Sequence, residues 1–232
     1  ADAVFLIVGE TSANSVESKD RPDTRLAPGQ IALIAAVTAA NPRTAVIANV
    51  GHAFDTSWDE RAAALMLVWY PGQGFAPALA SVLAGDREPG GRLPVSIAMQ
   101  EADYCGLSTM PDDNGDLAYA EGVNVGYRGL IANVTQARHA FGSGMGYAQF
   151  EWSDVAAEQG GVAVTLRNTS SRAGSEVIQL YRDTPECALI GFAKVRLEPG
   201  EERRVVVKPE PKMLRLWKDR WQLMTGARPM RV

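Results

Sequence analysis

Short apolar runs alternate with helical patterns over residues 1–97. The runs are continuous, which is typical of parallel strands buried on both faces, whereas the helical segments carry apolar residues at spacings of three and four. The first helical pattern begins at Pro28 and stops before Pro42. We expect strands at 3–8, 44–50, 64–69 and 93–97, and helices at 28–40, 58–63 and 75–84. This order predicts a parallel sheet with helices on its faces.

The pattern changes twice further along the chain. Residues 98–146 are rich in Gly, Asp and Asn without periodicity, which indicates a connecting segment. Beyond it, apolar and polar residues alternate at 162–167, and more short strands are expected at 177–181, 192–197 and 203–208. Turn residues separate these runs, so a β-sandwich is predicted. Its expected inward residues are Val162, Val164, Leu166, Val177 or Ile178, Val195 and Val206.

These patterns predict an α/β plus all-β fold. A partial parallel α/β sandwich domain is expected at 1–105, a connecting segment at 106–150, and a β-sandwich of fibronectin type III-like form at 151–232. The first strand looks like an internal strand of its sheet, so we expect the chain to begin inside a domain.

Composition excludes several functional classes. The chain has 46% hydrophobic and 22% charged residues with a net charge of -4, and Lys and Arg form no cluster that would favour nucleic acid. The apolar stretch 62–70 is too short to span a membrane. Cys105 and Cys187 are far apart, which indicates free thiols rather than a disulfide or metal site. The turn at 71–74 lacks the spacing of a phosphate-binding loop, so no cofactor is expected.

The loop 9–27 is the strongest candidate for chemistry. It is long for a strand-to-helix connection and contains Glu10, Glu17, Asp20 and Arg21. In an open parallel sheet the loops after the strands share one edge, so loops 51–57 and 70–74 are expected beside it. Such a loop can hold a carboxyl group against a substrate, although a charged loop is also typical of a plain solvated surface. His52 either touches a ligand or packs against its neighbours.

Several short strings, in order along the chain, resemble family 3 glycoside hydrolases. In the first part they are VGE at 8–10, ESKDRPD at 17–23, WYPGQ at 69–73, PGGRLP at 89–94, YAEGVNVGYR at 119–128 and FGSGMGY at 141–147. Downstream, NT at 168–169, RAG at 172–174, VIQLY at 177–181, GFAKV at 191–195 and LEPGE at 197–201 resemble the fibronectin type III-like domain of that family.

The resemblance implies a (β/α)8-type barrel, an α/β sandwich domain and a fibronectin type III-like module, with the active site between the first two. In the family the barrel supplies an aspartate nucleophile, and a long loop of the second domain supplies the glutamate acid/base. On this chain that glutamate is Glu17, and Glu10 is the competing candidate. Glu17 ranks first because Glu10 follows its strand too closely to reach far into a neighbouring domain. Asp20 and Arg21 on the same loop are the implied substrate contacts.

The chain departs from the family pattern in two ways. It contains no Ser-Asp-Trp nucleophile motif and is too short for a barrel, and Gly74–Pro77 replaces an acidic residue and a Gly-Asn pair. We therefore expect it to supply the acid/base loop, but not the nucleophile, of a retaining β-glycosidase acting on terminal β-linked sugars, above all glucose. The expected partners are that saccharide, an N-terminal barrel or a chain that carries it, and a second copy of the chain. The resemblance favours a secreted or periplasmic location.

Two other functional classes remain open at this stage. One is a non-catalytic role, in which the chain shapes a sugar site or stabilises a partner that holds the barrel. The other is a flavodoxin-like nucleotide-binding protein with an appended sandwich, which the absence of a phosphate-binding motif disfavours.

Overall fold

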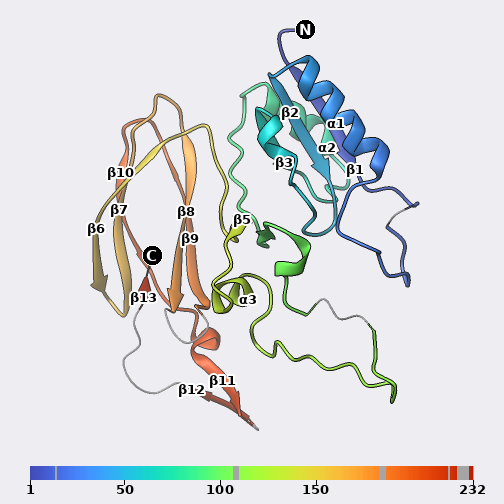
Figure 1. Ribbon diagram of the computed structural model, residues 1–232. Helices are drawn as coiled ribbons and strands as arrows, with labels where there is room; N and C mark the ends of the chain where they lie inside the picture. Colours follow the sequence, from blue (N-terminus) through green and yellow to red (C-terminus); the bar gives the residue numbers. More distant parts are fainter. Residues whose placement is uncertain (14, 107–109, 183–186, 219, 224–229, 232) are drawn as a thin grey trace. The chain divides into compact units, whose positions relative to one another are not determined.

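The computed structural model describes residues 1–13, 15–106, 110–182, 187–218, 220–223 and 230–231. They form two compact units (Figure 1). The first comprises Ala1–Pro77 and Val95–Phe141, and the second comprises Ala78–Pro94 and Gly142–Val232. The predicted α/β plus all-β fold is confirmed. Within the described part of the chain, every helix is too short or too polar to cross a membrane.

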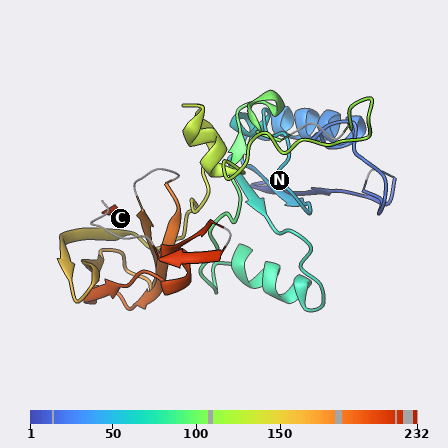
Figure 2. The ribbon, with the colours of Figure 1, turned by 90° about the horizontal axis from the view of Figure 1, so that it is seen from below.

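The first unit is built on a parallel sheet in the order β1-β2-β3. Its strands are β1 (Val4–Gly9), β2 (Thr44–Asn49) and β3 (Ala64–Leu67). Figure 2 shows helix α1 (Pro28–Ala40) lying along one face of this sheet. The core between them is apolar and consists of Val8, Leu26, Ile34, Val46, Ala48, Val50, Phe54, Trp58 and Ile97.

The predicted helices of this region agree with the structure. Helix α1 has the predicted bounds: Pro28 needs no N–H donor in the first turn, and Asn41 turns extended at the end. Helix α2 (Phe75–Leu83) and the 3₁₀ helix η1 (Asp59–Arg61) fall inside the predicted segments.

Strand β1 differs from the expectation of burial on both faces. Phe5 and Ile7 are 53% and 58% exposed, while Val8 is buried. The expectation was wrong for the described residues because β1 is an edge strand, and α1 covers only one face of it.

The predicted fourth strand, at 93–97, was also wrong. The observed strand β4 (Ile97–Ala98) pairs antiparallel with β5 (Ala137–His139) and does not extend the parallel sheet. Leu93 instead exchanges backbone hydrogen bonds with Ser143 and Gly142, and Pro94 has no N–H to donate to a ladder.

Residues 98–146 contain more structure than the sequence pattern indicated. Besides β5 they include η2 (Glu101–Asp103) and helix α3 (Tyr127–Ala132). The ring of Tyr127 stacks on that of Phe141 with centroids 4.5 Å apart. These elements are too short to generate a recognisable period, which explains why they were missed.

The second unit is a β-sandwich, as predicted. One sheet has the order β10-β7-β6 and another β13-β8-β9, while β11 and β12 form a separate hairpin. The strands are β6 (Phe150–Glu158), β7 (Gly161–Asn168), β8 (Gly174–Arg182), β9 (Leu189–Leu197), β10 (Glu202–Val207), β11 (Arg215–Lys218), β12 (Arg220–Leu223) and β13 (Met230–Arg231). A 3₁₀ helix, η3 (Pro211–Leu214), precedes β11.

The inward residues of this sandwich agree with the prediction except on β10. Of the predicted set, Val162, Val164, Leu166, Ile178 and Val195 are buried in one core. On β10 the buried residue is Val207 and not the predicted Val206. Val207 pairs with Val162, and paired residues of antiparallel strands face the same side, so the register of β10 fixes Val207 inward.

A carboxylate fastens β5 to η1 in the first unit. Asp59 accepts hydrogen bonds from the Arg138 guanidinium and, at 2.6 Å, from Nε2 of His139. Its side chain is 11% exposed, and burial alone would raise its pKa. The hydrogen bonds and positive charges of Arg138 and His139 outweigh burial and hold the pKa of Asp59 below its ordinary value of 3.8.

We predict that Asp59→Asn destabilises the first unit by about 3 kcal/mol at pH 7, because it leaves Arg138 facing a neutral amide. A lowered carboxyl pKa contributes stability above the ordinary value, and this contribution is lost as the pH falls below 3.8. The difference between wild type and variant should therefore shrink at acid pH. Urea unfolding followed by circular dichroism measures both effects. Glu60→Gln is the matched control: Glu60 contacts the same Arg138 but is 86% exposed, so a change below about 1 kcal/mol is expected.

Candidate active site

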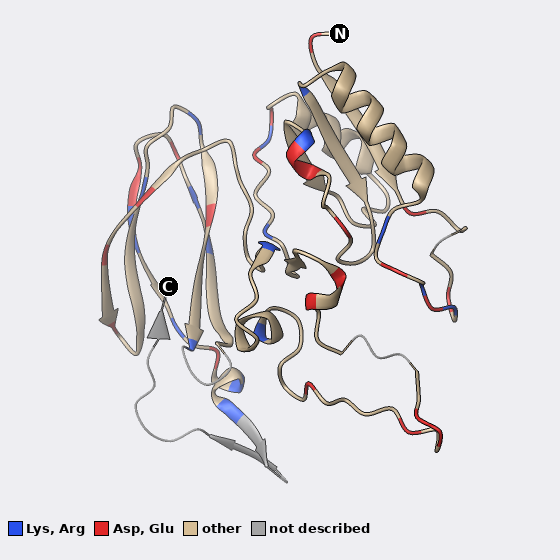
Figure 3. Ribbon diagram, in the orientation of Figure 1, with Lys and Arg blue, Asp and Glu red and all other residues tan. Residues whose placement is uncertain are grey.

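The three loops that follow β1, β2 and β3 leave the sheet at one edge, as predicted. The strands are parallel and adjacent, with Val4 opposite Thr44 and Ala45 opposite Ala64. Their carboxyl ends therefore coincide, and the loops 10–27, 50–58 and 68–74 begin side by side (Figure 1). Figure 3 shows residues of both charge signs along the first of these loops.

The start of this first loop is fixed to α1 and β2. The side-chain amide of Gln30 accepts from the backbone N–H of Gly9 at 2.7 Å and donates to its carbonyl at 2.6 Å. The N–H of Glu10 then donates to the carbonyl of Asn49. A Cβ at position 9 would lie 2.4 Å from that carbonyl oxygen, so the close approach requires glycine. The backbone thus directs Glu10 out over the carboxyl edge.

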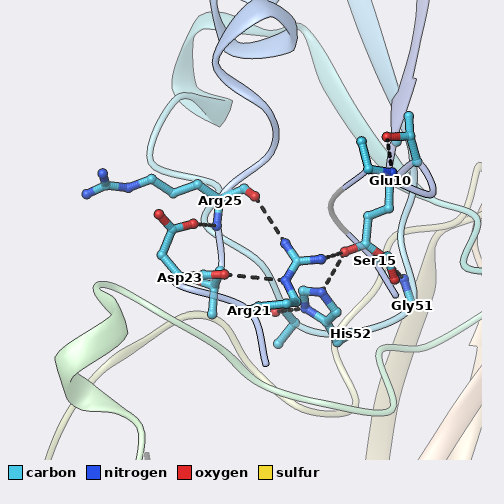
Figure 4. Close-up of polar contacts among 12 residues, drawn as sticks. Glu10, Ser15, Arg21, Asp23, Arg25, Gly51 and His52 are labelled. Carbon is cyan, nitrogen blue, oxygen red and sulfur yellow. Dashed lines mark hydrogen bonds and ion pairs between the residues drawn. The ribbon is translucent and has the colours of Figure 1, made fainter. Parts of the chain in front are cut away.

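The carboxylate of Glu10 is the centre of the polar network at this edge (Figure 4). It accepts from the Arg21 guanidinium, from His52 Nε2 at 2.6 Å, from the N–H of Gly51 at 2.9 Å and from the Tyr70 hydroxyl at 2.6 Å. The side chain is only 2% exposed. All the loops of the edge therefore meet at one buried carboxylate.

The donors around Glu10 hold it ionised. Burial alone raises the pKa of this carboxyl, but the hydrogen bonds from Tyr70 and Gly51 and the charges of His52 and Arg21 act in the opposite direction and prevail. The pKa of Glu10 consequently lies below its ordinary value of 4.5.

His52 and Tyr70 are oriented by further contacts. The other ring nitrogen of His52 faces the carbonyl of Ala53, so each ring nitrogen lies against an oxygen atom and the ring is held in place. The Tyr70 hydroxyl donates its hydrogen bond to Glu10, so the hydroxyl of Ser15 donates to the Tyr70 oxygen at 3.3 Å. A Cβ at position 51 would lie 2.5 Å from the ring of Tyr70, so the chain needs Gly51 for this approach.

Arg21 fixes the returning limb of the loop. Besides Glu10, its guanidinium donates to the carbonyls of Asp23 and Arg25. The Asp23 carboxylate in turn accepts from the N–H of Arg25 at 2.8 Å. The structure therefore brings the predicted residues Glu10 and Arg21 together. The N–H groups of Arg21 donate to acceptors within the protein.

Glu17 and Asp20 lie on the outer part of the same loop. Both are exposed, and Glu17 sits in a turn with Ser18, whose φ is 62°. Within the described residues the Glu17 carboxylate has no hydrogen-bond or ion-pair partner. The outer part of the loop thus presents an exposed carboxyl group, while the two ends of the loop are fixed to the sheet edge.

A small cavity adjoins the returning limb in the same unit. It has a volume of about 200 Å³, and its lining includes Thr24, Asp55, Gln100, Glu101 and Tyr104. Glu101 accepts from both the N–H and the hydroxyl of Thr24, at 3.1 Å each. No group of His, Cys, Asp and Glu in the described part of the chain has the arrangement of a metal site.

Comparison with known proteins identifies the family. Residues 1–127 match the glycosyl hydrolase family 3 C-terminal domain, and residues 176–231 match a fibronectin type III-like domain. A β-glucosidase of Rhizobium radiobacter is 36% identical over 232 residues, which cover 92% of this chain and 28% of that protein. An exo-α-(1→6)-L-arabinopyranosidase of Bifidobacterium breve is 31% identical, covering 100% of this chain and 33% of that protein.

Solved structures agree with the sequence comparison. DesR, a β-glucosidase from Streptomyces venezuelae crystallised with D-glucose, superposes with a TM-score of 0.87 at 32% identity, over 99% of this chain and 31% of its own. The chain thus spans about a third or less of the length of these relatives. Because the first family match alone covers more than half of the 232 residues and the second falls in the sandwich, this chain belongs to glycosyl hydrolase family 3.

Proposed function

We propose that this chain provides the acid/base loop of a retaining β-glucosidase, with Glu17 as the general acid/base. The observation that carries the proposal is the similarity of nearly the whole chain to β-glucosidases, at 36% identity in sequence and a TM-score of 0.87 in structure. The assignment is supported by the exposed carboxyl group of Glu17 and by the contact between Glu10 and Arg21, which fixes the two ends of its loop.

The chemistry favours Glu17 over Glu10. A general acid must carry a proton at working pH and deliver it to the leaving oxygen. Glu10 is buried among donors that lower its pKa, so it is a poor proton donor, and both of its oxygens already accept hydrogen bonds from the protein. Glu17 is exposed and has no hydrogen-bond or ion-pair partner among the described residues, so its carboxyl group can meet a leaving oxygen.

The second carboxylate of the reaction must come from elsewhere. Retaining glycosidases need two carboxyl groups about 5–5.5 Å apart, one of which attacks the anomeric carbon. We propose that a barrel domain, on the same polypeptide or on a partner chain, supplies that aspartate. Asp20, exposed close to Glu17, is proposed to accept from a sugar hydroxyl. Arg21 contributes to the same site by holding the loop.

The proposed substrate is a terminal β-linked glucose. The similar arabinopyranosidase makes an α-L-arabinopyranoside the second candidate. Aryl glycosides of both sugars, offered to the complete enzyme, distinguish them by kcat/KM.

We predict that Glu17→Ala in the complete enzyme lowers kcat by about 10²–10⁴-fold on substrates with poor leaving groups. Activated aryl glycosides should lose far less, because their leaving groups depart without a proton. Azide should partly restore turnover by intercepting the glycosyl-enzyme. Glu60→Gln, an exposed carboxylate away from the loop, is the control. A nearly silent Glu17→Ala, together with this signature in Glu10→Ala, would reverse the assignment.

We predict that this chain expressed alone hydrolyses no β-glucoside above background and self-associates. It lacks the nucleophile motif, and Phe5 and Ile7 expose apolar surface on the same face of an edge strand. Size-exclusion chromatography with an aryl β-glucoside assay tests both points. Replacing Phe5 and Ile7 by Ser should reduce association without creating activity. Turnover by a monomeric chain would refute the proposal.

A further inference from the structure

We propose that Glu10 is a positioning residue that locks the loop bearing Glu17 onto the sheet edge. This inference rests on the proposed role of Glu17. Its basis is that Glu10 joins the ends of all three parallel strands. The residue itself follows β1, Gly51 and His52 follow β2, and Tyr70 follows β3.

The same carboxylate also closes the loop at its base. Arg21 donates to Glu10, so the two residues bracket the segment 11–20 that contains Glu17. Closing a flexible segment at its base removes most of the conformations that its tip can reach. The hydrogen bond from Ser15 to Tyr70 adds a second attachment, on the outgoing limb. Both limbs are therefore tied to the sheet edge, and Glu17 lies between the two ties.

Hydrophobic packing does not perform this task. Among the described residues of the segment 11–25 none is buried, and Leu26 is the first that is. A segment without buried apolar side chains must be held by polar contacts, and here these converge on a carboxylate that is 2% exposed. The guanidinium of Arg21 is positive and faces Glu10 directly, so removing the charge of Glu10 leaves this guanidinium without its ion-pair partner.

Removing the Glu10 contacts should change the position of Glu17 and leave the carboxyl group of Glu17 itself unaltered. A general acid works only within hydrogen-bond reach of the leaving oxygen, and a displacement of about 1 Å can cost about 10²-fold in rate. Loss of the Glu10 contacts should therefore slow proton transfer to the leaving group. The rate should fall most for substrates whose leaving groups depend on that proton.

The test compares Glu10→Gln with Glu17→Ala in the complete enzyme. We expect Glu10→Gln to lower kcat about 10–100-fold on a poor leaving group and only a few-fold on an activated one, with KM little changed. Azide should not raise the turnover of Glu10→Gln, because the Glu17 side chain is still present and leaves no space for azide beside the anomeric carbon. Asp59→Asn is the matched control, because Asp59 is also a largely shielded carboxylate that binds an arginine and a histidine in the same unit. The control should lose stability without any change in leaving-group dependence.

Hydrogen exchange gives a readout that does not depend on activity. Backbone amides at 15–21 should exchange at least about 10-fold faster in Glu10→Gln than in wild type, with those of β2 unaffected. His52→Ala, which removes one donor from a half-exposed position, should show a smaller change in the same direction and serves if Glu10→Gln does not fold.

The outcomes separate the inference from the proposed function. If Glu17→Ala behaves as an acid/base variant while Glu10→Gln matches Asp59→Asn in leaving-group dependence and loop exchange, the lock is refuted and the function stands. If Glu17→Ala is silent, the proposed function fails, and unchanged loop exchange in Glu10→Gln would overturn the lock as well. Faster exchange together with selective loss on poor leaving groups supports it.

Discussion

Parallel pairing of β1, β2 and β3 places the ends of all three strands at one edge of the first unit. Each strand end then projects a polar group toward the same point. Glycine at position 9 allows the close approach of the Asn49 backbone, and glycine at position 51 allows that of the Tyr70 ring. The register matters because a shift of one residue would turn Glu10 to the opposite face of the sheet. The network therefore depends on backbone pairing before it depends on any charge.

Two glutamates on one loop have opposite surroundings. Glu10 is enclosed by donors that keep it ionised, while Glu17 is exposed and without a partner in the described part of the chain. Environments that separate the protonation of neighbouring carboxyl groups also separate their roles. Glu10 is suited to hold structure at any pH above its lowered pKa, and Glu17 is accessible to a substrate. This division supports an acid/base role for Glu17 and a structural role for Glu10.

The sequence was sufficient for those features that are determined locally. Helix α1 has its predicted bounds because Pro28 and the Asn41-Pro42 pair mark its ends. The carboxyl-edge placement of loop 9–27 also followed from strand order alone. By contrast, the contacts of Glu10 with His52 and Tyr70 join residues separated by 42 and 60 positions, and no spacing motif connects them. Side-chain pairing of this kind is set by tertiary packing, so sequence reasoning left His52 undecided.

The same limit explains why the predicted inward residue of β10 was wrong and why the contact of His139 was not foreseen. Val206 and Val207 are equally apolar, and only pairing with Val162 decides which one faces the core. His139 contacts Asp59 from 80 positions away, and no sequence spacing indicates that contact. Asp59 and Glu10 nevertheless solve one physical problem in the same way. Each fastens a segment that offers little apolar surface by gathering an arginine and a histidine around a shielded carboxylate, where a hydrogen bond to a charged group is worth more than in water. Such a cluster gives up some stability to desolvation but allows few alternative geometries, which suits a loop whose tip must present Glu17 to a reacting bond.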